Sequence, residues 1–215
     1  MRVFVTGGTG VLGRAVLPRL AAAGHSAVAP GSRELDLFDP DAVAGALAGA
    51  GAIMHLATRI PLLRRMDEAG AWAENDRLRA EASRLLVDAA LAGGVETYVQ
   101  PTITFVYPPG PADEETPLGE VDVRLRSALV AEAQALRFAA AGRRGVVLRL
   151  GLLYGPGTGS DAPDPRLGAT LHADDAGEAL VAALGAPSGI YNVVEDGGPV
   201  SAARFEAATG WRPRR

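Results

Sequence analysis

The stretch Thr6-Gly-Gly-Thr-Gly-Val-Leu-Gly13 decides how this chain of 215 residues folds. It follows a short β-rich run at the N-terminus and precedes a segment with helical periodicity. Between a strand and a helix, we expect Gly7 to permit a tight turn, Gly10 to let a pyrophosphate approach the backbone, and Gly13 to let the helix pack close to the strand. The free N–H groups of the helix N-terminus attract an anion. The stretch therefore predicts a dinucleotide-binding turn.

Strand and helix signals alternate along the rest of the chain. Apolar runs typical of buried strands lie at Arg2–Thr6, Ser26–Pro30, Ala52–Leu56, Thr97–Gln100, Gly145–Leu150 and Ile190–Val194. Segments with helical signals lie at Val11–Ala23, Asp39–Ala48, Asp67–Ala92, Val121–Ala141 and Asp174–Leu184. Strands separated by helices form parallel sheets with right-handed crossovers and helices on both faces. We therefore expect an α/β fold, built as a Rossmann-type doubly wound parallel sheet.

Length and composition limit the classes of protein that fit. A chain of 215 residues with 48% hydrophobic residues suits one well-packed domain. We expect a single NAD(P)-binding Rossmann-like domain over residues 1–215, with a minimal substrate-binding region at about 151–215. The net charge of −4 is spread along the chain without a basic block, so no nucleic-acid partner is expected.

Targeting, membrane and metal-binding signals are missing from the sequence. Every apolar run is far shorter than a membrane span, and the N-terminus enters a strand directly instead of forming a signal peptide. The chain has no cysteine, which excludes disulfides and thiolate metal sites, and no cluster of other ligands has metal spacing. We therefore expect a cytoplasmic protein with no membrane partner and no metal.

The end of the second expected strand bears on the choice of dinucleotide. An acidic residue usually holds the adenosine ribose hydroxyls at this position, but here the strand ends Ala29-Pro-Gly-Ser-Arg33. Ser32 and Arg33 could hold a 2′-phosphate instead, so NADP is favoured over NAD. The alternative is that Arg33 is a solvated loop charge.

These residues resemble the short-chain dehydrogenase/reductase superfamily, specifically its extended or atypical branch, the NAD-dependent epimerase/dehydratase family. Besides the glycine turn, the resemblance rests on Asp36-Leu37, His55-Leu-Ala57, Asn75, Val106-Tyr107, Tyr154-Gly-Pro-Gly157, His172-Ala-Asp-Asp175 and Tyr191-Asn-Val193. The turn and the resemblance together predict the cofactor-binding residues Thr6, Gly7, Gly8, Thr9, Gly10, Val11, Leu12, Gly13, Ser32, Arg33, Asp36, Leu37, Leu56, Ala57 and Thr58.

The reaction centre of that family is absent from this sequence. The family uses a Tyr-x-x-x-Lys pair on a helix, in which the lysine lowers the pKa of the tyrosine and holds the nicotinamide ribose. All 21 basic residues of this chain are arginine. Ser127 and Glu132 match the family's Ser-Lys-x-x-x-Glu register. This register puts Ala128 where lysine belongs and Arg124 where tyrosine belongs.

Four residues remain as candidates for catalysis. Thr102 and Thr104 flank Ile103, which takes the position of the family's serine, and either hydroxyl could bind a substrate carbonyl. Tyr107 could donate a proton, and Arg124 could polarise a carbonyl or bind an anion. Each also has a structural interpretation: the threonines could fill a strand end, the tyrosine could line a pocket, and the arginine could lie on a solvated helix face.

The resemblance implies an NAD(P)-binding oxidoreductase that acts on a small carbonyl or alcohol substrate through a non-standard proton relay. Two alternatives are open: a non-redox isomerase, dehydratase or cyclase of a small natural product, or a dinucleotide-sensing protein without turnover. The segment Thr158–Leu171, which covers the substrate in relatives, is short. We therefore expect a small or open pocket, or one completed by a second subunit in a homodimer.

Overall fold

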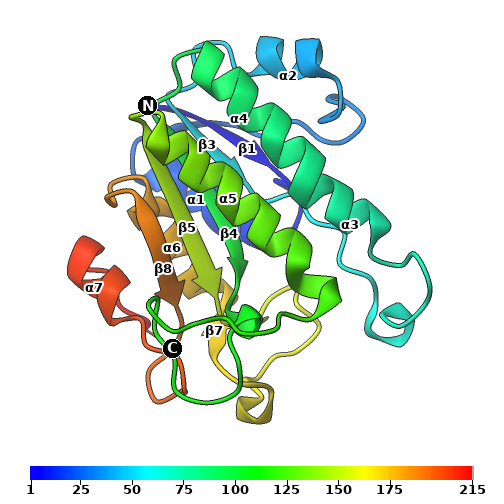
Figure 1. Cartoon of the computed structure of the whole chain (residues 1–215). Coiled ribbons are helices and arrows are strands. Elements are labelled where there is room, and N and C mark those ends of the chain that lie inside the picture. Colours follow the sequence, from blue (N-terminus) through cyan, green and yellow to red (C-terminus); the bar gives the residue numbers. More distant parts are fainter. Residues whose placement is uncertain (215) are drawn as a thin grey trace.

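A parallel sheet of six strands, in the order β2-β1-β3-β4-β5-β8, forms the centre of the molecule (Figure 1). The structure is a computed structural model, and it describes residues 1–214. The strands are β1 Arg2–Thr6, β2 Ser26–Val28, β3 Ala52–His55, β4 Thr97–Ile103, β5 Arg144–Leu150 and β8 Gly189–Val193. The prediction of a Rossmann-type parallel sheet is confirmed.

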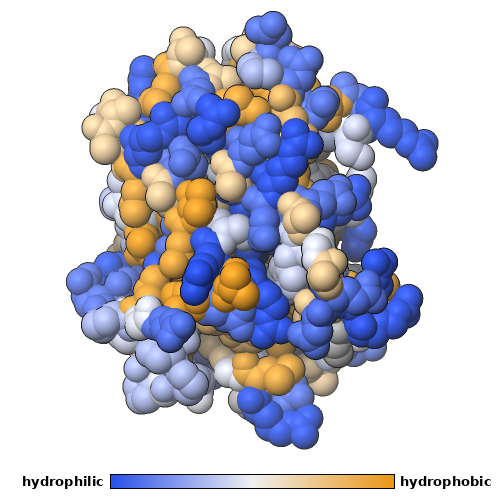
Figure 2. All heavy atoms as spheres, turned by 45° about the vertical axis from the view of Figure 1, so that its right-hand side comes forward, coloured by the Kyte–Doolittle hydropathy of each residue, from blue (hydrophilic) through white to orange (hydrophobic). Residues whose placement is uncertain are grey.

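Helices cover both faces of this sheet (Figure 1). One face carries α1 Val11–Ala22 and α6 Ala173–Ala183, and the other carries α2 Pro40–Ala46, α4 Ser83–Ala92 and α5 Arg126–Ala140. Alternate side chains of a strand point to opposite faces, so Val3 and Val5 pack in one core and Phe4 packs in the other. The outer surface shown in Figure 2 is largely hydrophilic, interrupted by groups of hydrophobic residues.

The strand order places a crevice beside the glycine turn. β1 pairs with β2 on one side and with β3 on the other, and Thr6 lies opposite His55 where β1 and β3 end. The connection after β1 leads to β2 on one side of it, and the connection after β2 crosses back to β3 on the other side. Ligands of open α/β sheets bind beyond the carboxyl ends of the strands at such a reversal.

The segment expected as one helix over Asp67–Ala92 begins later than predicted. A 3₁₀ turn at Leu63–Arg65 precedes it, and Gly70 adopts a φ of 76°, a left-handed conformation that a helix cannot contain. The helix then runs over residues 73–92 as α3 Ala73–Arg77, a π-helical turn η2 at Leu78–Ala82, and α4. These residues are called the long helix below.

The last third of the chain contains elements that the sequence analysis did not predict. β6 Leu152–Tyr154 and β7 Thr170–His172 form a separate parallel pair, and α7 Ala203–Thr209 packs near β8. A bridge between Ala112 and Val200 joins the expected loop after β4 to the segment after β8. None of the helices described in residues 1–214 has the length and hydropathy needed to cross a membrane.

Candidate functional site

The glycines of the first turn have distinct structural roles. Gly7 has a φ of 70°, and a Cβ atom there would lie 2.7 Å from the amide nitrogen of Ala57. A Cβ atom on Gly13 would lie 2.4 Å from the carbonyl oxygen of Gly7, so this glycine is required by the turn itself. A Cβ atom on Gly10 would meet only that carbonyl, at 3.2 Å. Gly10 therefore leaves the outer side of the turn open for a ligand.

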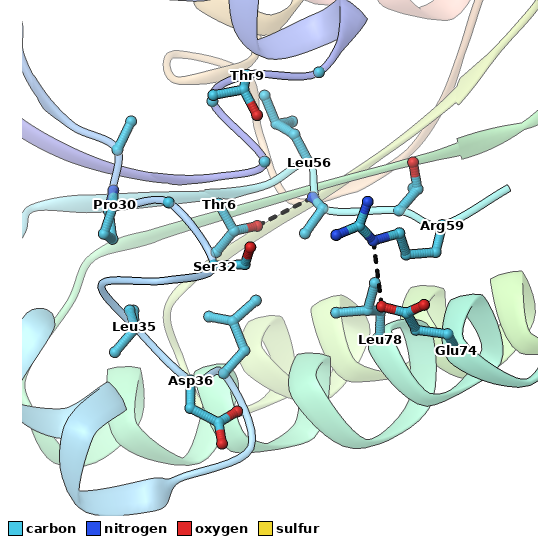
Figure 3. Close-up of a pocket in the computed structure, with 18 of the residues that line it drawn as sticks. Thr6, Thr9, Pro30, Ser32, Leu35, Asp36, Leu56, Arg59, Glu74 and Leu78 are labelled. Atoms are coloured by element: carbon cyan, nitrogen blue, oxygen red, sulfur yellow. Dashed lines mark hydrogen bonds and ion pairs between the residues drawn. The ribbon is translucent and has the colours of Figure 1, made fainter.

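A cavity of about 590 Å³ opens from this turn beyond the ends of β1 and β3 (Figure 3). Its volume is typical of small-molecule sites. Of the residues predicted to bind the cofactor, those lining the cavity are Thr6, Gly7, Gly8, Thr9, Gly10, Ser32, Asp36, Leu37, Leu56, Ala57 and Thr58. Val11, Leu12, Gly13 and Arg33 do not line it. The residues present therefore fit a nucleotide, with the glycine turn open to its phosphates.

Sequence reasoning missed part of the cavity lining. Leu35 and Phe38 adjoin the predicted pair Asp36-Leu37, whereas Glu74 and Leu78 belong to the long helix. A spacing of four residues places Glu74 and Leu78 on one helix face, which is the signal that could have found them. The guanidinium of Arg59 donates a hydrogen bond of 3.2 Å to Glu74 at the cavity (Figure 3).

His55 is buried behind the cavity, and its two hydrogen-bond partners select one neutral tautomer of the ring. Its Nε2 faces the carbonyl oxygen of Leu78 at 3.2 Å, so this nitrogen carries the hydrogen and donates it. Its Nδ1 then accepts from the hydroxyl of Thr6 at 2.7 Å, and that hydroxyl oxygen accepts from the amide of Ala57. Burial lowers the pKa of His55 from 6.5 to about 4. The neutral ring therefore holds β1, β3 and the long helix together.

A buried ionic network occupies the carboxyl half of β4 and β5. Arg149 is 4% exposed, and its guanidinium donates to both carboxylate oxygens of Glu132 on α5, at 2.9 and 2.6 Å. Thr102 donates to Glu132 at 2.8 Å. Arg149 also donates to the hydroxyl of Tyr107, which donates to Asn192 at 3.0 Å. The hydroxyls of Thr102 and Tyr107 are therefore engaged in internal bonds.

The four candidate catalytic residues are thus in three different environments. Thr102 and Tyr107 belong to the network, and burial raises the pKa of Tyr107 even though Arg149 opposes the shift. Thr104 is buried, and its hydroxyl has no hydrogen-bond partner within residues 1–214. The side chain of Arg124 is 44% exposed and forms ion pairs with Asp122 and Asp67. The structure therefore does not bring Arg124 into the network.

A second cavity, of about 370 Å³, lies beside the end of β4. Thr104, Phe105 and Tyr107 line one part of it, and residues 166–169 and 199–200 line another. The C-terminal third of the chain thus contributes directly to a cavity next to the candidate catalytic residues.

His172 has a structural role at the start of α6. Its Nδ1 accepts a hydrogen bond of 3.1 Å from the amide of Asp174, so the histidine caps the helix. Asp174 instead forms an ion pair with Arg19 of α1, at 3.0 Å.

The fold and the glycine turn define a nucleotide-binding α/β protein, and comparison with known proteins gives its family. Residues 3–171 match the family model described as NAD dependent epimerase/dehydratase family. The chain belongs to this family.

One curated relative is 36% identical over 233 residues, which cover 91% of this chain and 76% of the relative. It is a 3-diazoavenalumate denitrifying reductase from a Streptomyces species. Among solved structures, RMD from Pseudomonas aeruginosa complexed with NADPH aligns with a TM-score of 0.82 at 21% identity, covering 100% of this chain and 95% of that one. The dTDP-glucose 4,6-dehydratase DesIV from Streptomyces venezuelae, with NAD and TYD bound, aligns with a TM-score of 0.81 at 18% identity, covering 100% and 92%. At these identities the structures show the shared fold.

Proposed function

We propose that this protein is an NAD(P)H-dependent reductase of a small-molecule acceptor. The observation that carries the proposal is the glycine turn opening into the cavity of about 590 Å³, with Gly10 leaving room for phosphates. When bound, a reduced nicotinamide dinucleotide supplies a hydride. The family membership and a relative named as a reductase support this class of reaction.

NADP is the proposed form of the cofactor. Ser32 lines the cavity beside the end of β2, and no acidic residue occupies positions 29–33. Arg33 is exposed next to it, where its guanidinium could reach a 2′-phosphate. Parallel titrations with NADPH and NADH, followed by nicotinamide fluorescence, test this preference. We expect Arg33→Ala to weaken the binding of NADPH and to leave the binding of NADH unchanged. An equal loss of affinity for both would contradict the proposed preference for NADP.

The source of the proton limits which classes of acceptor this protein can reduce. α5 contains neither tyrosine nor lysine, and Ala128 on it is fully buried. The hydroxyls of Thr102 and Tyr107 are engaged with Glu132, Arg149 and Asn192. A carbonyl acceptor would therefore take its proton from Thr104 or from water, without a tyrosine–lysine pair to deliver it.

A diazo group removes this requirement. The relative at 36% identity is named for a diazo substrate and for denitrification. An aryl diazonium ion is already cationic, so a hydride that takes the place of N₂ leaves a neutral arene. One C–N bond breaks, one C–H bond forms, N₂ departs with the bonding electron pair, and no proton is needed. We therefore propose an aryl diazo compound as the acceptor, with a carbonyl compound as the second candidate.

Isotope labelling tests the reaction and also whether the new hydrogen comes from NADPH or from solvent. The protein is incubated with NADPH deuterated at C4 of the nicotinamide and with 4-diazobenzoate as probe, and the benzoate formed is analysed for deuterium. We expect NADPH oxidation, N₂ release, and deuterium on the ring carbon from NADPH but none from D₂O. Deuterium from solvent, or no oxidation of NADPH with either diazonium or carbonyl probes, would contradict the proposal. Dinucleotide binding without any oxidation would identify a sensor instead.

A further inference from the structure

Arg79 is a buried cation that forms no ion pair within residues 1–214. It lies on the long helix, is 7% exposed, and its Nη1 is fully buried without a hydrogen bond in the part of the chain that the structure describes. The other buried arginine, Arg149, has both carboxylate oxygens of Glu132. Burying a charge without a partner is costly. An unsatisfied buried group in a native protein calls for an explanation, and a bound ion or ligand is one of them.

The nearby acids do not satisfy Arg79. Glu132 and Asp76 attract it electrostatically, but neither forms an ion pair with it. Glu132 already accepts three hydrogen bonds from Arg149 and Thr102, and Asp76 has a buried oxygen without a hydrogen-bond partner in residues 1–214. Burial lowers the pKa of Arg79, yet a guanidinium remains protonated at neutral pH. Arg79 therefore retains its positive charge.

Other unpaired donors lie on the elements around Arg79. Within residues 1–214, the buried side-chain atoms without hydrogen-bond partners are Asn75 Nδ2, Asp76 Oδ1, Arg79 Nη1, Thr104 Oγ1 and Ser127 Oγ. Asn75 precedes Arg79 by one helical turn, and its Oδ1 already accepts from the amide of Arg59, which leaves its NH₂ group as the free donor. Ser127 lies in the first turn of α5.

These elements pack against one another at one edge of the sheet. The π-helical turn that carries Arg79 contacts α5, and α5 contacts β4, which ends just before Thr104 (Figure 1). Leu78, next to Arg79, lines the dinucleotide cavity. Four of the five unpaired atoms can donate hydrogen bonds, two of them hydroxyls that can also accept, whereas Asp76 Oδ1 only accepts. A set of donors around a cation is suited to an anion.

We propose that Arg79, with Asn75 and Ser127, binds a carboxylate of the acceptor between the long helix and α5, next to the dinucleotide cavity that Leu78 lines. A planar guanidinium can hold both oxygens of a carboxylate. The dinucleotide phosphates already have the glycine turn, whereas an acceptor carboxylate has no other buried cation free to pair with it in residues 1–214. The assignment rests on the proposed reductase function.

Benzoate and its neutral analogue benzamide test the site without turnover. Binding to the wild-type protein is measured by isothermal titration calorimetry, with and without saturating NADPH. We expect benzoate to bind at least 10-fold more tightly than benzamide, and NADPH to leave that affinity unchanged or to strengthen it. Equal binding of the two probes would overturn the proposal. Competition between benzoate and NADPH would assign the anion site to the dinucleotide and would overturn the acceptor assignment.

Variants separate anion binding from a structural role. Arg79→Met should lose benzoate binding at least 10-fold and raise the melting temperature of the free protein, because an unpaired buried charge is removed. Arg79→Lys should retain part of the binding. The matched control is Arg84→Met, since Arg84 is exposed on the same helix and pairs with Asp88. Unchanged benzoate binding in Arg79→Met, or a lower melting temperature than the control, would overturn the proposal. NADPH binding by Arg79→Met, with loss of benzoate binding, leaves the reductase proposal to its own test.

Discussion

Two regions at the same edge of the sheet differ in how completely their polar groups are satisfied. At the ends of β1 and β3, the hydroxyl of Thr6 bonds to His55 and Ala57, and His55 bonds to Leu78. At the end of β4, Glu132 and Arg149 pair with each other, but nearby buried donors have no hydrogen-bond partner in residues 1–214.

The first region has its final shape without a ligand, whereas the second contains buried polar groups without partners in the described residues. The glycine turn needs no ligand to reach its shape, because its geometry follows from Gly7 and Gly13. The region around Arg79 leaves a charge and several hydrogen bonds unsatisfied, so part of its stability depends on what binds. We expect substitutions in the glycine turn to remove binding of the cofactor. Removal of the unpaired charge in the second region should raise stability and weaken binding of the acceptor.

The largest expected effect is at Gly10. Gly10→Val adds a branched side chain on the open side of the turn, where a pyrophosphate would lie, while the nearest protein atom leaves room for a Cβ at 3.2 Å. The fold should survive, and affinity for NADPH should fall by at least about 1,000-fold, or about 4 kcal/mol. Fluorescence titration measures the loss, and Gly45→Val, in α2 with nothing near its Cβ position, is the control. Unchanged affinity would mean that phosphates do not bind at this turn.

Breaking the ionic network should have the next largest effect. Glu132→Gln leaves Arg149 as a second buried cation without a counterion, and it should cost about 3 kcal/mol or more of unfolding free energy. Urea denaturation measures this loss. The control is Glu81→Gln, because Glu81 forms an exposed pair with Arg77 and its substitution should change the unfolding free energy far less. Equal losses in the two variants would show that the network does not hold β4, β5 and α5 together.

The sequence predicts the first region well because its information is local. Glycines three residues apart, a strand before them and a helix after them lie within Arg2–Ala22, and the strand–helix alternation extends the same reasoning to the sheet. The helix start near Asp67 was predicted wrongly because a left-handed Gly70 interrupts the segment. The cap of α6 is His172, whose Nδ1 accepts from the amide of Asp174, and no local pattern in the sequence predicted it.

The second region depends on contacts between residues far apart in the chain. Thr102 and Glu132 are 30 positions apart, and Tyr107 and Asn192 are 85 apart. Nothing local distinguishes the buried Arg79 from the exposed Arg77, since both lie on an amphipathic helix. Their burial is decided by α5 packing over one face of the long helix. Thr102 and Tyr107 were reasonable catalytic candidates by position, but their hydroxyls are engaged in internal hydrogen bonds.

The first region should also show a pH dependence that His55 creates. The pKa of its ring is about 4 in the folded protein and 6.5 when unfolded, so the unfolded state binds a proton first as the pH falls. The stability that His55 contributes is complete above pH 6.5 and is lost as the pH falls to 4, by about 2 to 3 kcal/mol. Denaturation curves at several pH values measure this slope. We expect His55→Gln to flatten it and His25→Gln, at a partly exposed position, to keep it; the same slope in both variants would contradict the assignment.

The smallest effects on unfolding free energy are expected at Thr102 and Thr104, which lie two positions apart in the sequence. Thr102→Val removes a hydrogen bond to a charged carboxylate and should cost about 1.5 kcal/mol or more. Thr104→Val replaces a buried hydroxyl that has no partner in the described residues, so its effect on unfolding free energy should be near zero or slightly favourable. If Thr104 contacts the acceptor in the cavity of about 370 Å³, the same variant should lower kcat/KM about 10-fold. Urea denaturation and turnover measured on both variants give the two effects, and a destabilised Thr104→Val with normal turnover would mean that this hydroxyl belongs to the structure and not to the site.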